Sequence, residues 1–275
     1  YYLKLKNLAK DMRNFHNYIK SSIIYTHCHS NFKNNKAQSI LDIGCGRGGD
    51  IHKFYMAEID YYVGIDPDNN NLISVDGALS RYNQFKRKYP GFPKMIFIQA
   101  DAKAPFSYDD QKRIVSNMTT QNKNLLQEYF SKNKKTKFDI INASFSIHYM
   151  FENNNSFNNL KTNINNHLRN NGFVLITTFN GKLIRELLKG KDKYTENYLD
   201  DDNNKQILFE IVKKFNDSDP IGTGLKIDVF NSFEASRTYS SEYIIDKEFI
   251  VDEFNNDCDL ELVDFDYFKN QFEIH

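Results

Sequence analysis

The sequence predicts a doubly wound, Rossmann-like α/β fold, in which helices cover both faces of a parallel sheet. Five short apolar runs rich in β-branched residues alternate with stretches of helical character. Each run is apolar almost throughout, as expected for strands that are buried on both faces. Helical connections between such strands make the sheet parallel. The predicted strands are residues 39–43, 61–65, 95–98, 138–143 and 173–178.

A long amphipathic helix is predicted before the first strand, over residues 3–25. Its apolar residues recur at spacings of three and four, which places them on one helical face. They are Leu5, Leu8, Met12, Phe15, Ile19 and Ile23. We expect this helix to pack on the domain rather than to begin the sheet.

The pattern changes after the fifth strand. Residues 191–205 are polar and rich in Asn and Asp, which predicts a loop, and alternating segments at 226–230 and 239–245 predict antiparallel strands. A final strand is predicted at 260–268. We expect a single domain over residues 1–275. Its expected parts are a helical extension (1–37), an α/β core (38–190), an inserted lid (191–245) and final core elements (246–275), the last of them truncated.

Composition narrows the class of protein. Lys and Arg together number 36 and so do Asp and Glu, so any contact with nucleic acid needs a local basic cluster. No apolar run approaches the ~18 residues that cross a bilayer, and no secretory signal is visible, which predicts a soluble intracellular protein. Three scattered cysteines, Cys28, Cys45 and Cys258, argue against disulfides. His27 and His29 flank Cys28, but no second ligand pair follows, so we expect no metal.

A glycine-rich turn follows the first predicted strand. Residues 44–50 read Gly-Cys-Gly-Arg-Gly-Gly-Asp, and a helix is expected from about Ile51. Glycines allow positive φ angles and the close approach of a ligand, and the start of a helix presents unpaired N–H groups. The spacing also fits the dinucleotide pattern G-x-G-x-x-G, so a nicotinamide cofactor is one alternative. A turn without any ligand is the other.

Acidic residues around the turn bear on this choice. Asp42 precedes the turn, Asp50 ends it, Asp66 ends the second strand and Asp101 follows the third. These carboxylates would repel a pyrophosphate but attract a ligand that carries a sulfonium and an amine without phosphates. Asp66, about 20 residues past the turn, suits a ribose diol, and Asp101 suits the exocyclic amine of adenine. The sequence therefore favours S-adenosylmethionine over NAD.

Five segments of the chain resemble the cap guanine-N7 methyltransferases, especially those of large DNA viruses. They are 15–21 (Phe-His-Asn-Tyr-Ile-Lys-Ser), 41–50 (Leu-Asp-Ile-Gly-Cys-Gly-Arg-Gly-Gly-Asp), 64–66 (Gly-Ile-Asp), 147–152 (Ile-His-Tyr-Met-Phe-Glu) and 241–243 (Ser-Glu-Tyr). The segments keep the order of that family and span most of the chain. The resemblance implies a class I S-adenosylmethionine-dependent methyltransferase fold with an N-terminal helix and a small antiparallel insertion. It implies methyl transfer to N7 of the 5′ cap guanine of RNA.

The resemblance, together with the turn, implies two sets of binding residues. The donor set is Lys20, Asp42, Gly44, Gly46, Asp50, Asp66, Asp101 and Ser144. The cap set is Asn17, Lys20, Arg47, Arg81, His148, Tyr149 and Glu242. Two positions depart from the family. Ser144 stands where Gln is common, and the late cap-stacking tyrosine has no clear counterpart.

The chemistry of the implied reaction limits what the residues must do. Guanine N7 carries a lone pair and no proton, so its attack on a sulfonium methyl needs no general base. We expect no catalytic acid or base, and orientation by Tyr149, His148 and Glu242 instead. Lys20, Arg47 and Arg81 would face the triphosphate. Ordinary alternatives are a solvated Lys20, an Arg47 that caps a helix and an Arg81 paired with an acid of its own helix.

Partners and alternatives follow from the same resemblance. The implied partners are capped RNA and either other capping domains of one polypeptide or a stimulatory subunit, with no membrane. The implied location is the cytoplasm, in a viral factory or virion, for a viral protein, and the nucleus for a cellular one. Two alternatives stay open. One is a catalytically inactive methyltransferase fold that acts as a regulatory subunit, and the other is a methyltransferase of another RNA position or a small molecule.

Overall fold

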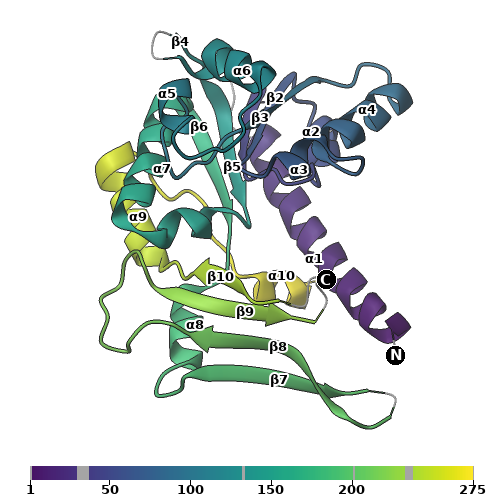
Figure 1. Cartoon of the computed structure of the whole chain (residues 1–275), viewed down its shortest axis with the longest axis vertical. Helices are drawn as coiled ribbons and strands as arrows, with labels where there is room; N and C mark the ends of the chain where they lie inside the picture. Colours follow the sequence, from purple (N-terminus) through teal and green to yellow (C-terminus); the bar gives the residue numbers. More distant parts are fainter. Residues whose placement is uncertain (1, 30–36, 132–133, 201, 233–237, 275) are drawn as a thin grey trace. The chain divides into compact units, whose positions relative to one another are not determined.

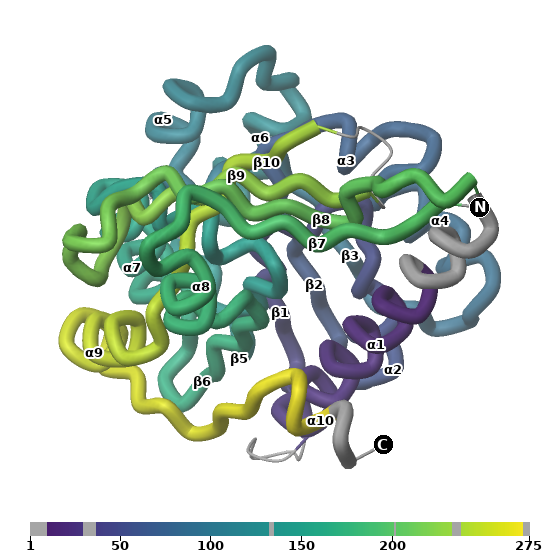
Figure 2. Tube along the Cα trace, turned by 90° about the horizontal axis from the view of Figure 1, so that it is seen from below, coloured from purple at the N-terminus to yellow at the C-terminus, as the bar shows by residue number. Residues whose placement is uncertain are grey.

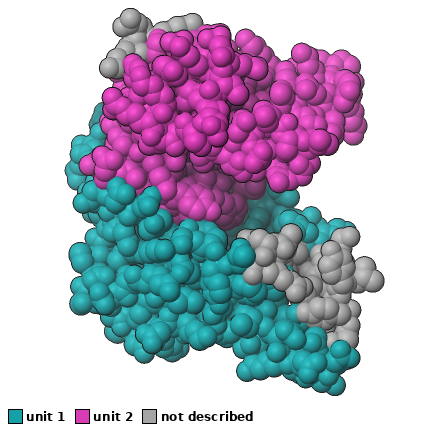
Figure 3. Space-filling view, in the orientation of Figure 1, with its two compact units in different colours: residues 1–19, 151–154, 179–275 teal, residues 20–150, 155–178 magenta. Residues whose placement is uncertain are grey.

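The computed structural model describes residues 2–29, 37–131, 134–200, 202–232 and 238–274. The chain divides into two compact units, which Figure 3 distinguishes by colour. Unit 1 comprises Tyr1–Ile19, Phe151–Asn154 and Phe179–His275, and unit 2 comprises Lys20–Met150 and Asn155–Thr178. The long helix α1 (Tyr2–His29) contributes residues to both units.

Unit 2 contains the predicted parallel sheet, with five strands in the order β3-β2-β1-β5-β6 (Figure 1). Its strands are β1 (Ser39–Ile43), β2 (Tyr61–Asp66), β3 (Lys94–Gln99), β5 (Phe138–Ser144) and β6 (Leu168–Thr177). The connections are α2 (Ile51–Met56), α3 (Asn69–Ile73), α4 (Ala78–Lys88), α5 (Tyr108–Gln111), α6 (Thr120–Phe130), the short β4 (Lys134–Lys135), the 3-10 helix η1 (Ile147–Glu152) and α7 (Asn154–His167). All neighbouring strands pair in parallel, so the predicted fold class is confirmed.

Helices cover both faces of this sheet, because successive residues of a strand point to opposite faces. The rings of Tyr62 and Phe54 of α2 lie 5.4 Å apart on one face. On the other face the ring of Tyr61 lies 6.2 Å from that of Tyr129 of α6. The apolar character of each strand is therefore explained by burial on two sides.

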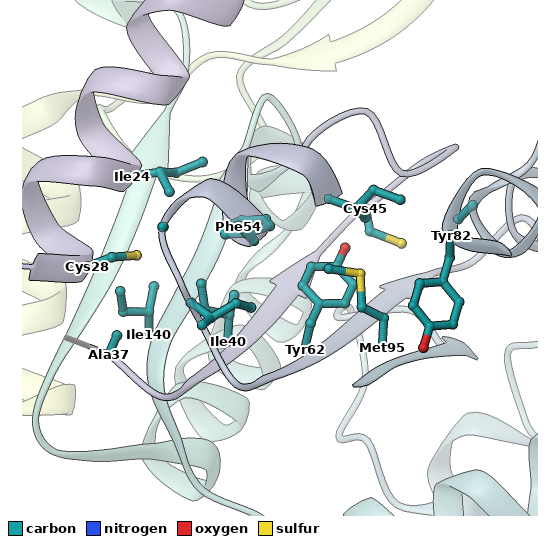
Figure 4. Packing of buried hydrophobic residues seen from close by; sticks show 14 of the residues in the cluster. Ile24, Cys28, Ala37, Ile40, Cys45, Phe54, Tyr62, Tyr82, Met95 and Ile140 are labelled. Atoms are coloured by element: carbon teal, nitrogen blue, oxygen red, sulfur yellow. The ribbon is translucent and has the colours of Figure 1, made fainter. Parts of the chain in front are cut away.

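The principal core of unit 2 lies on the α2 side of the sheet (Figure 4). The C-terminal half of α1 contributes Ile24 and Cys28 to it, both almost completely buried, although neither belongs to the predicted apolar face. Of the predicted residues, Ile23 is half-buried against this core, whereas Met12 is exposed. Burial raises the pKa of the Cys28 thiol to about 12, so this cysteine acts as a small apolar residue. In the described part of the chain no helix is long and apolar enough to cross a membrane.

Unit 1 contains an antiparallel sheet of four strands in the order β10-β9-β8-β7, which Figure 2 shows side by side. The strands are β7 (Lys193–Leu199), β8 (Lys205–Lys213), β9 (Lys226–Asn231) and β10 (Ser240–Tyr243), and the helices are α8 (Gly181–Leu187), α9 (Lys247–Cys258) and α10 (Phe268–Ile274). One face of the sheet packs on Leu188 and Phe215 through Ile227 and its neighbours. The predicted antiparallel segments correspond to β9 and β10.

The prediction of a loop over residues 191–205 is wrong, because most of this segment forms β7 and the hairpin that joins it to β8. Asp200, Asp202, Asn203 and Asn204 lie at the turn of this hairpin. There the carboxylate of Asp200 accepts hydrogen bonds from the backbone N–H groups of Asp202 (3.1 Å) and Asn204 (2.8 Å). Strand β7 is polar and only half-buried, so its sequence lacks the apolar alternation that identifies a strand.

The prediction of a final strand over residues 260–268 is also wrong. Residues 259–267 form no helix or strand, and α10 begins at Phe268. The side chains of Leu262, Val263 and Phe265 are exposed. A strand forms only where another backbone supplies hydrogen-bond partners, and the described residues pair no strand with this segment.

Candidate active site

The predicted donor residues lie at one edge of the parallel sheet, because parallel strands end at the same edge. Asp42 of β1 is in register with Gly64 of β2 and Asn142 of β5. Asp66 and Ser144 are the last residues of β2 and β5. The topology therefore brings together side chains that are far apart in the sequence.

Hydrogen bonds fasten the glycine-rich turn to the end of β2. The backbone N–H groups of Gly44 and Cys45 both donate to the Ile65 carbonyl oxygen at 2.9 Å. The N–H of Gly46 donates to Asp66 Oδ2, also at 2.9 Å. Gly46 has φ +52°, and open space lies where a Cβ atom would project. The turn thus presents bare backbone beside a carboxylate.

Gly44 is required for a different reason, which is close packing against the loop after β5. A Cβ atom on Gly44 would lie 2.4 Å from Ser146 Cβ, and the residue has φ +71°. Ser146 is fixed in place because its hydroxyl donates to the Ile43 carbonyl oxygen at 2.5 Å. The two glycines therefore serve separate purposes, packing at Gly44 and an open surface at Gly46.

Gly44→Ala is expected to lower the free energy of unfolding by roughly 3 kcal/mol, since overpacking and a positive φ angle both cost energy. In Gly46→Ala only the positive φ angle costs energy, so the free energy of unfolding should fall by about 1 kcal/mol. Urea unfolding of both variants beside the wild type measures this difference. Equal losses in the two variants would contradict the packing role of Ser146.

Asp42 is almost completely buried beneath the turn. Its carboxylate accepts hydrogen bonds from the Tyr62 hydroxyl and from Asn142 Nδ2, both at 2.7 Å. Burial, and then the charge of Asp50, raise the pKa of Asp42 to about 6. Asp42 is therefore a negative charge that titrates just below neutral pH. Sequence reasoning missed Tyr62 and Asn142, because each lies on a neighbouring strand and no local motif marks it.

Asp66 keeps hydrogen-bonding capacity on the turn side of its carboxylate. Oδ1 accepts from the Asp68 N–H (3.0 Å) and from Asn71 Nδ2 (3.1 Å), whereas within the described part of the chain Oδ2 accepts from the Gly46 N–H alone. A carboxylate oxygen can accept two hydrogen bonds. Burial raises the pKa of Asp66, although the hydrogen bonds from Asn71, Asp68 and Gly46 oppose this shift. A ligand hydroxyl that donates to Oδ2 would complete its coordination.

Asp101 lies two residues beyond β3, in a loop that Gln111 of α5 holds. Gln111 Oε1 accepts from the Asp101 N–H and Gln111 Nε2 donates to the Asp101 carbonyl oxygen, both at 2.8 Å. The Asp101 carboxylate accepts from the Lys103 N–H at 2.9 Å. Gln111 was not predicted as a site residue. Its complete burial indicates that it positions this loop.

Asp50 is held between two lysines. Its carboxylate forms ion pairs with Lys20 and Lys53, with N–O distances of 2.8 Å in each. Burial alone would raise the pKa of Asp50, but the two ammonium groups outweigh burial and lower it. Asp50 is therefore an ionised member of a cluster with a net positive charge. Lys53 was not predicted as a site residue; it is buried and lies three residues beyond Asp50 on α2.

Phe145 is a further residue that sequence reasoning did not single out. It follows β5 directly and has φ +53°, a conformation that costs about 1–3 kcal/mol in a bulky residue. Its N–H donates to the Thr177 carbonyl oxygen at 2.8 Å, and its ring centroid lies 5.9 Å from Lys20 Nζ. Ser144, which precedes it, donates through its hydroxyl to Asn142 Oδ1 at 2.9 Å. The sequence signal that could have identified Phe145 is its position directly after a parallel strand.

The predicted cap residues of unit 2 lie in α1, the glycine-rich turn, α4 and η1. His148 and Tyr149 are neighbours in η1, with ring centroids 4.1 Å apart. His148 is buried, whereas Tyr149 is 41% exposed. Arg47, in the turn, pairs with Asp76 where both side chains are largely exposed. Such a surface pair is weak, so the guanidinium can turn to a phosphate.

Arg81 lies on α4, which contains no acidic residue. The alternative that Arg81 pairs with an acid of its own helix is thereby excluded. Asn17 and Glu242 belong to unit 1. Asn17 is exposed on α1, and Glu242 is buried on β10, where one of its oxygens accepts from the Ser240 hydroxyl at 3.0 Å.

The chain is similar to known proteins along nearly its whole length. Residues 6–273 match the mRNA (guanine-N(7))-methyltransferase domain. The chain is 43% identical over its whole length to a probable mRNA-capping enzyme of Acanthamoeba polyphaga mimivirus and spans 23% of that protein. It is 25% identical over 86% of its length to the mRNA-capping enzyme catalytic subunit of Fowlpox virus, of which it spans 24%.

More distant relatives extend the similarity. The mRNA cap guanine-N(7) methyltransferase of Cryptococcus neoformans is 29% identical over 64% of this chain and 24% of that protein. A crystal structure of an S-adenosylmethionine-dependent methyltransferase from Clostridium acetobutylicum shares the fold, with a TM-score of 0.52, 15% identity and coverage of 91% of this chain and 83% of that one. The family match covers nearly the whole sequence, and the chain therefore belongs to the mRNA (guanine-N(7))-methyltransferase domain family.

Proposed function

We propose that this chain transfers a methyl group from S-adenosylmethionine to N7 of the 5′ cap guanine of RNA. The observation that carries the proposal is the bare backbone at Gly46 fastened beside the Asp66 carboxylate, in a chain of this family. The mimivirus, poxvirus and fungal relatives are named as capping enzymes or cap methyltransferases. That activity is proposed here for the chain itself.

The residues at the turn fit the methyl donor. Open space beside Gly46 and Gly49 leaves room for a ligand against the backbone. Asp66 Oδ2 can accept a hydrogen bond from a ribose hydroxyl, and Asp42 adds negative charge beneath the turn. S-adenosylmethionine supplies a methyl group on a positively charged sulfur, which these carboxylates attract. A dinucleotide would place its phosphates against the same charges.

The Lys20–Asp50–Lys53 cluster is proposed to bind the amino-acid end of the donor. Two ammonium groups around one carboxylate leave a net positive charge that attracts the carboxylate of a ligand. Lys53 holds Asp50 ionised, so Lys20 need not do this alone. Lys53 thus acts as a positioning residue behind Lys20.

The cap guanine is proposed to lie against Tyr149. Its half-exposed ring can stack on the purine, and a π face favours the cation that forms when N7 is methylated. His148, whose ring centroid lies 4.1 Å from that of Tyr149, is proposed to orient the ring. On the family resemblance alone, Glu242 is proposed to accept hydrogen bonds from the guanine Watson–Crick edge. Asn17 is proposed to assist at the cap, and Arg47 and Arg81 to bind the triphosphate. No proton leaves N7, so rate enhancement comes from orientation and electrostatics.

The chain spans about a quarter of the mimivirus and poxvirus proteins that it resembles. We propose that it acts beside other capping domains of one polypeptide or with a stimulatory subunit. Two of these relatives are viral capping enzymes, and we propose a cytoplasmic place of action on that ground.

The direct test incubates the protein with GpppA-capped RNA and methyl-labelled donor, digests the RNA and identifies the labelled nucleoside. We expect 7-methylguanosine. Label on a ribose would replace this assignment with another RNA position. Donor binding without transfer to any position would instead identify the chain as an inactive regulatory fold.

The pKa of Asp42 predicts a pH dependence for donor binding. Above pH 6 Asp42 is ionised and attracts the sulfonium, so affinity for S-adenosylmethionine should rise roughly 3- to 10-fold from pH 5 to pH 7.5. The product S-adenosylhomocysteine carries a neutral sulfur and should change much less. Calorimetric titration of both ligands at both pH values gives the ratio, and Asp42→Asn should flatten it. An identical pH dependence for the two ligands would contradict the prediction.

Asp42 gives the stability of the fold the opposite pH dependence from the one expected for donor binding. The pKa of Asp42 is higher in the folded chain (about 6) than its ordinary value of 3.8. Its contribution to stability is therefore complete below pH 3.8 and is lost as pH rises through 6. Tighter donor binding at pH 7.5 thus cannot result from a more stable fold at Asp42.

A further inference from the structure

One stretch of the chain carries a strong local positive charge, although the formal net charge of the whole protein is zero. Residues 77–100 contain no Asp or Glu but five basic residues, of which Lys86, Arg87 and Lys88 form the last turn of α4 and Lys94 begins β3. Cations near the end of a helix are stabilised by its dipole, which explains part of this pattern. That effect does not explain Lys94 or the aromatic residues beside it.

We call Lys86, Arg87, Lys88 and Lys94, with the rings of Phe85 and Tyr89, the α4 basic surface. All four basic side chains are exposed, and in the described part of the chain none of them forms an ion pair. Two of them lie over aromatic rings instead. Lys88 Nζ is 5.0 Å from the centroid of Tyr89, and Lys86 Nζ is 5.8 Å from that of Tyr82. Their charge is therefore not neutralised by nearby carboxylates.

The rings form a half-buried layer over the core of unit 2. The centroid of Phe85 is 5.2 Å from that of His52 of α2 and 5.9 Å from that of Tyr89. Each of these rings keeps part of its surface exposed. The pKa of His52 is lowered by burial and then by the charges of Lys88 and Lys53, which reports a positive field at this layer. Cations and partly open rings are thus interleaved.

The position of α4 connects this surface with the proposed cap site. Arg81, assigned to the triphosphate, lies in the first half of α4, and the basic turn is at its other end (Figure 1). The helix has 11 residues and is therefore about 16 Å long. All of these residues belong to unit 2. A nucleic acid strand that begins at Arg81 can follow α4 to the basic turn.

We propose that the α4 basic surface binds the single-stranded RNA that follows the cap, with phosphates on the four cations and unpaired bases on Phe85 and Tyr89. This inference rests on the proposed function. Single-stranded RNA suits the surface because it offers a phosphate at each nucleotide and bases free to stack. An acidic protein segment would match the cations but would leave the rings unexplained.

The test compares Lys86→Gln/Arg87→Gln/Lys88→Gln with wild-type protein on fluorescein-labelled capped 15-nucleotide RNA. Each phosphate contact contributes about −0.7 to the slope of log K against log salt, so the slope should become shallower by about 2. The KM for this RNA should rise roughly 10-fold. Affinity for donor and KM for the dinucleotide GpppA should stay within about twofold, because neither reaches the surface.

A matched control removes three exposed lysines elsewhere, Lys10→Gln/Lys182→Gln/Lys189→Gln. It should leave the salt slope for the long RNA within about 0.5 of wild type. A control slope as shallow as that of the α4 variant would overturn the proposal, because only net charge would then matter. An unchanged slope and KM in the α4 variant would overturn it as well, and would leave a protein partner as the use of this surface.

Binding of an uncapped 15-nucleotide RNA separates this proposal from the proposed function. Its anisotropy titration needs no methyl transfer. The α4 variant should lose this binding even if no 7-methylguanosine forms with wild-type protein. Equal binding of uncapped RNA by both proteins would overturn the proposal that the α4 basic surface binds RNA, and would leave the proposed cap reaction unaffected.

Discussion

Asp66→Ala is expected to weaken binding of S-adenosylmethionine by about 100-fold or more, the largest effect on the donor of any single change proposed here. Asp66 Oδ2 is the acceptor beside the open backbone of Gly46. A hydrogen bond to a charged group contributes about 1.5–3 kcal/mol, and the variant loses both this bond from a ribose hydroxyl to Oδ2 and the attraction of the carboxylate for the sulfonium. A loss of about 3 kcal/mol corresponds to roughly 100-fold in affinity. Isothermal titration of donor and product measures it.

Two controls separate ligand binding from loss of structure. Asp66→Ala also removes the acceptor for the Gly46 and Asp68 N–H groups, so its thermal midpoint must be measured beside its affinity. Asp68→Asn changes a neighbouring exposed acid that caps α3 and should bind donor normally, because Asn caps equally well.

A double-mutant cycle gives the sharper test of the ribose contact. Wild-type protein should bind the 2′,3′-dideoxy analogue of S-adenosylhomocysteine far more weakly than the parent ligand. Asp66→Ala should bind the two ligands alike, because the carboxylate that reads the hydroxyls is gone. If loss of the two ribose hydroxyls weakens ligand binding to Asp66→Ala as much as it weakens binding to the wild type, Asp66 does not bind the ribose.

The strands of the parallel sheet were predictable because burial on two faces leaves a local signal. The predicted 39–43 agrees with β1 at both ends, and 61–65 and 138–143 each fall one residue short of β2 and β5. The turn after β1 was equally visible, since its glycines follow a strand directly. Burial and backbone geometry, which create these patterns, act within a few residues of the chain.

Features that depend on pairing between distant segments were not predictable. Residues 260–268 alternate between apolar and polar side chains as a strand does, yet a strand also needs a neighbouring backbone to pair with. Residues 193–199 have a polar sequence, but they form a strand because they pair with β8. The residues that contact the site residues could not be predicted for the same reason. Tyr62 and Asn142 reach Asp42 from adjacent strands, and Ser146 meets Gly44 across about 100 residues. Only the topology makes these residues neighbours.

Tyr149→Ala is expected to lower kcat/KM for capped RNA by about 100-fold while donor affinity stays within twofold. Stacking of a base on an aromatic ring contributes about 1–3 kcal/mol, and a guanine that is misplaced by ~1 Å loses further rate because N7 no longer faces the methyl. The side chain is 41% exposed, so its removal should leave the thermal midpoint nearly unchanged. Initial rates with GpppA-capped RNA measure the effect.

Tyr149→Phe is the matched control, because it keeps the ring and removes only the hydroxyl. If stacking is the role of Tyr149, Phe should retain most of the activity and Ala should not. The ring should also favour the cationic methylated cap over the neutral cap, and Tyr149→Ala should reduce that preference. If Tyr149→Ala instead weakens donor and cap binding to the same extent, the ring supports the segment between β5 and α7, which begins at Phe145, rather than the purine.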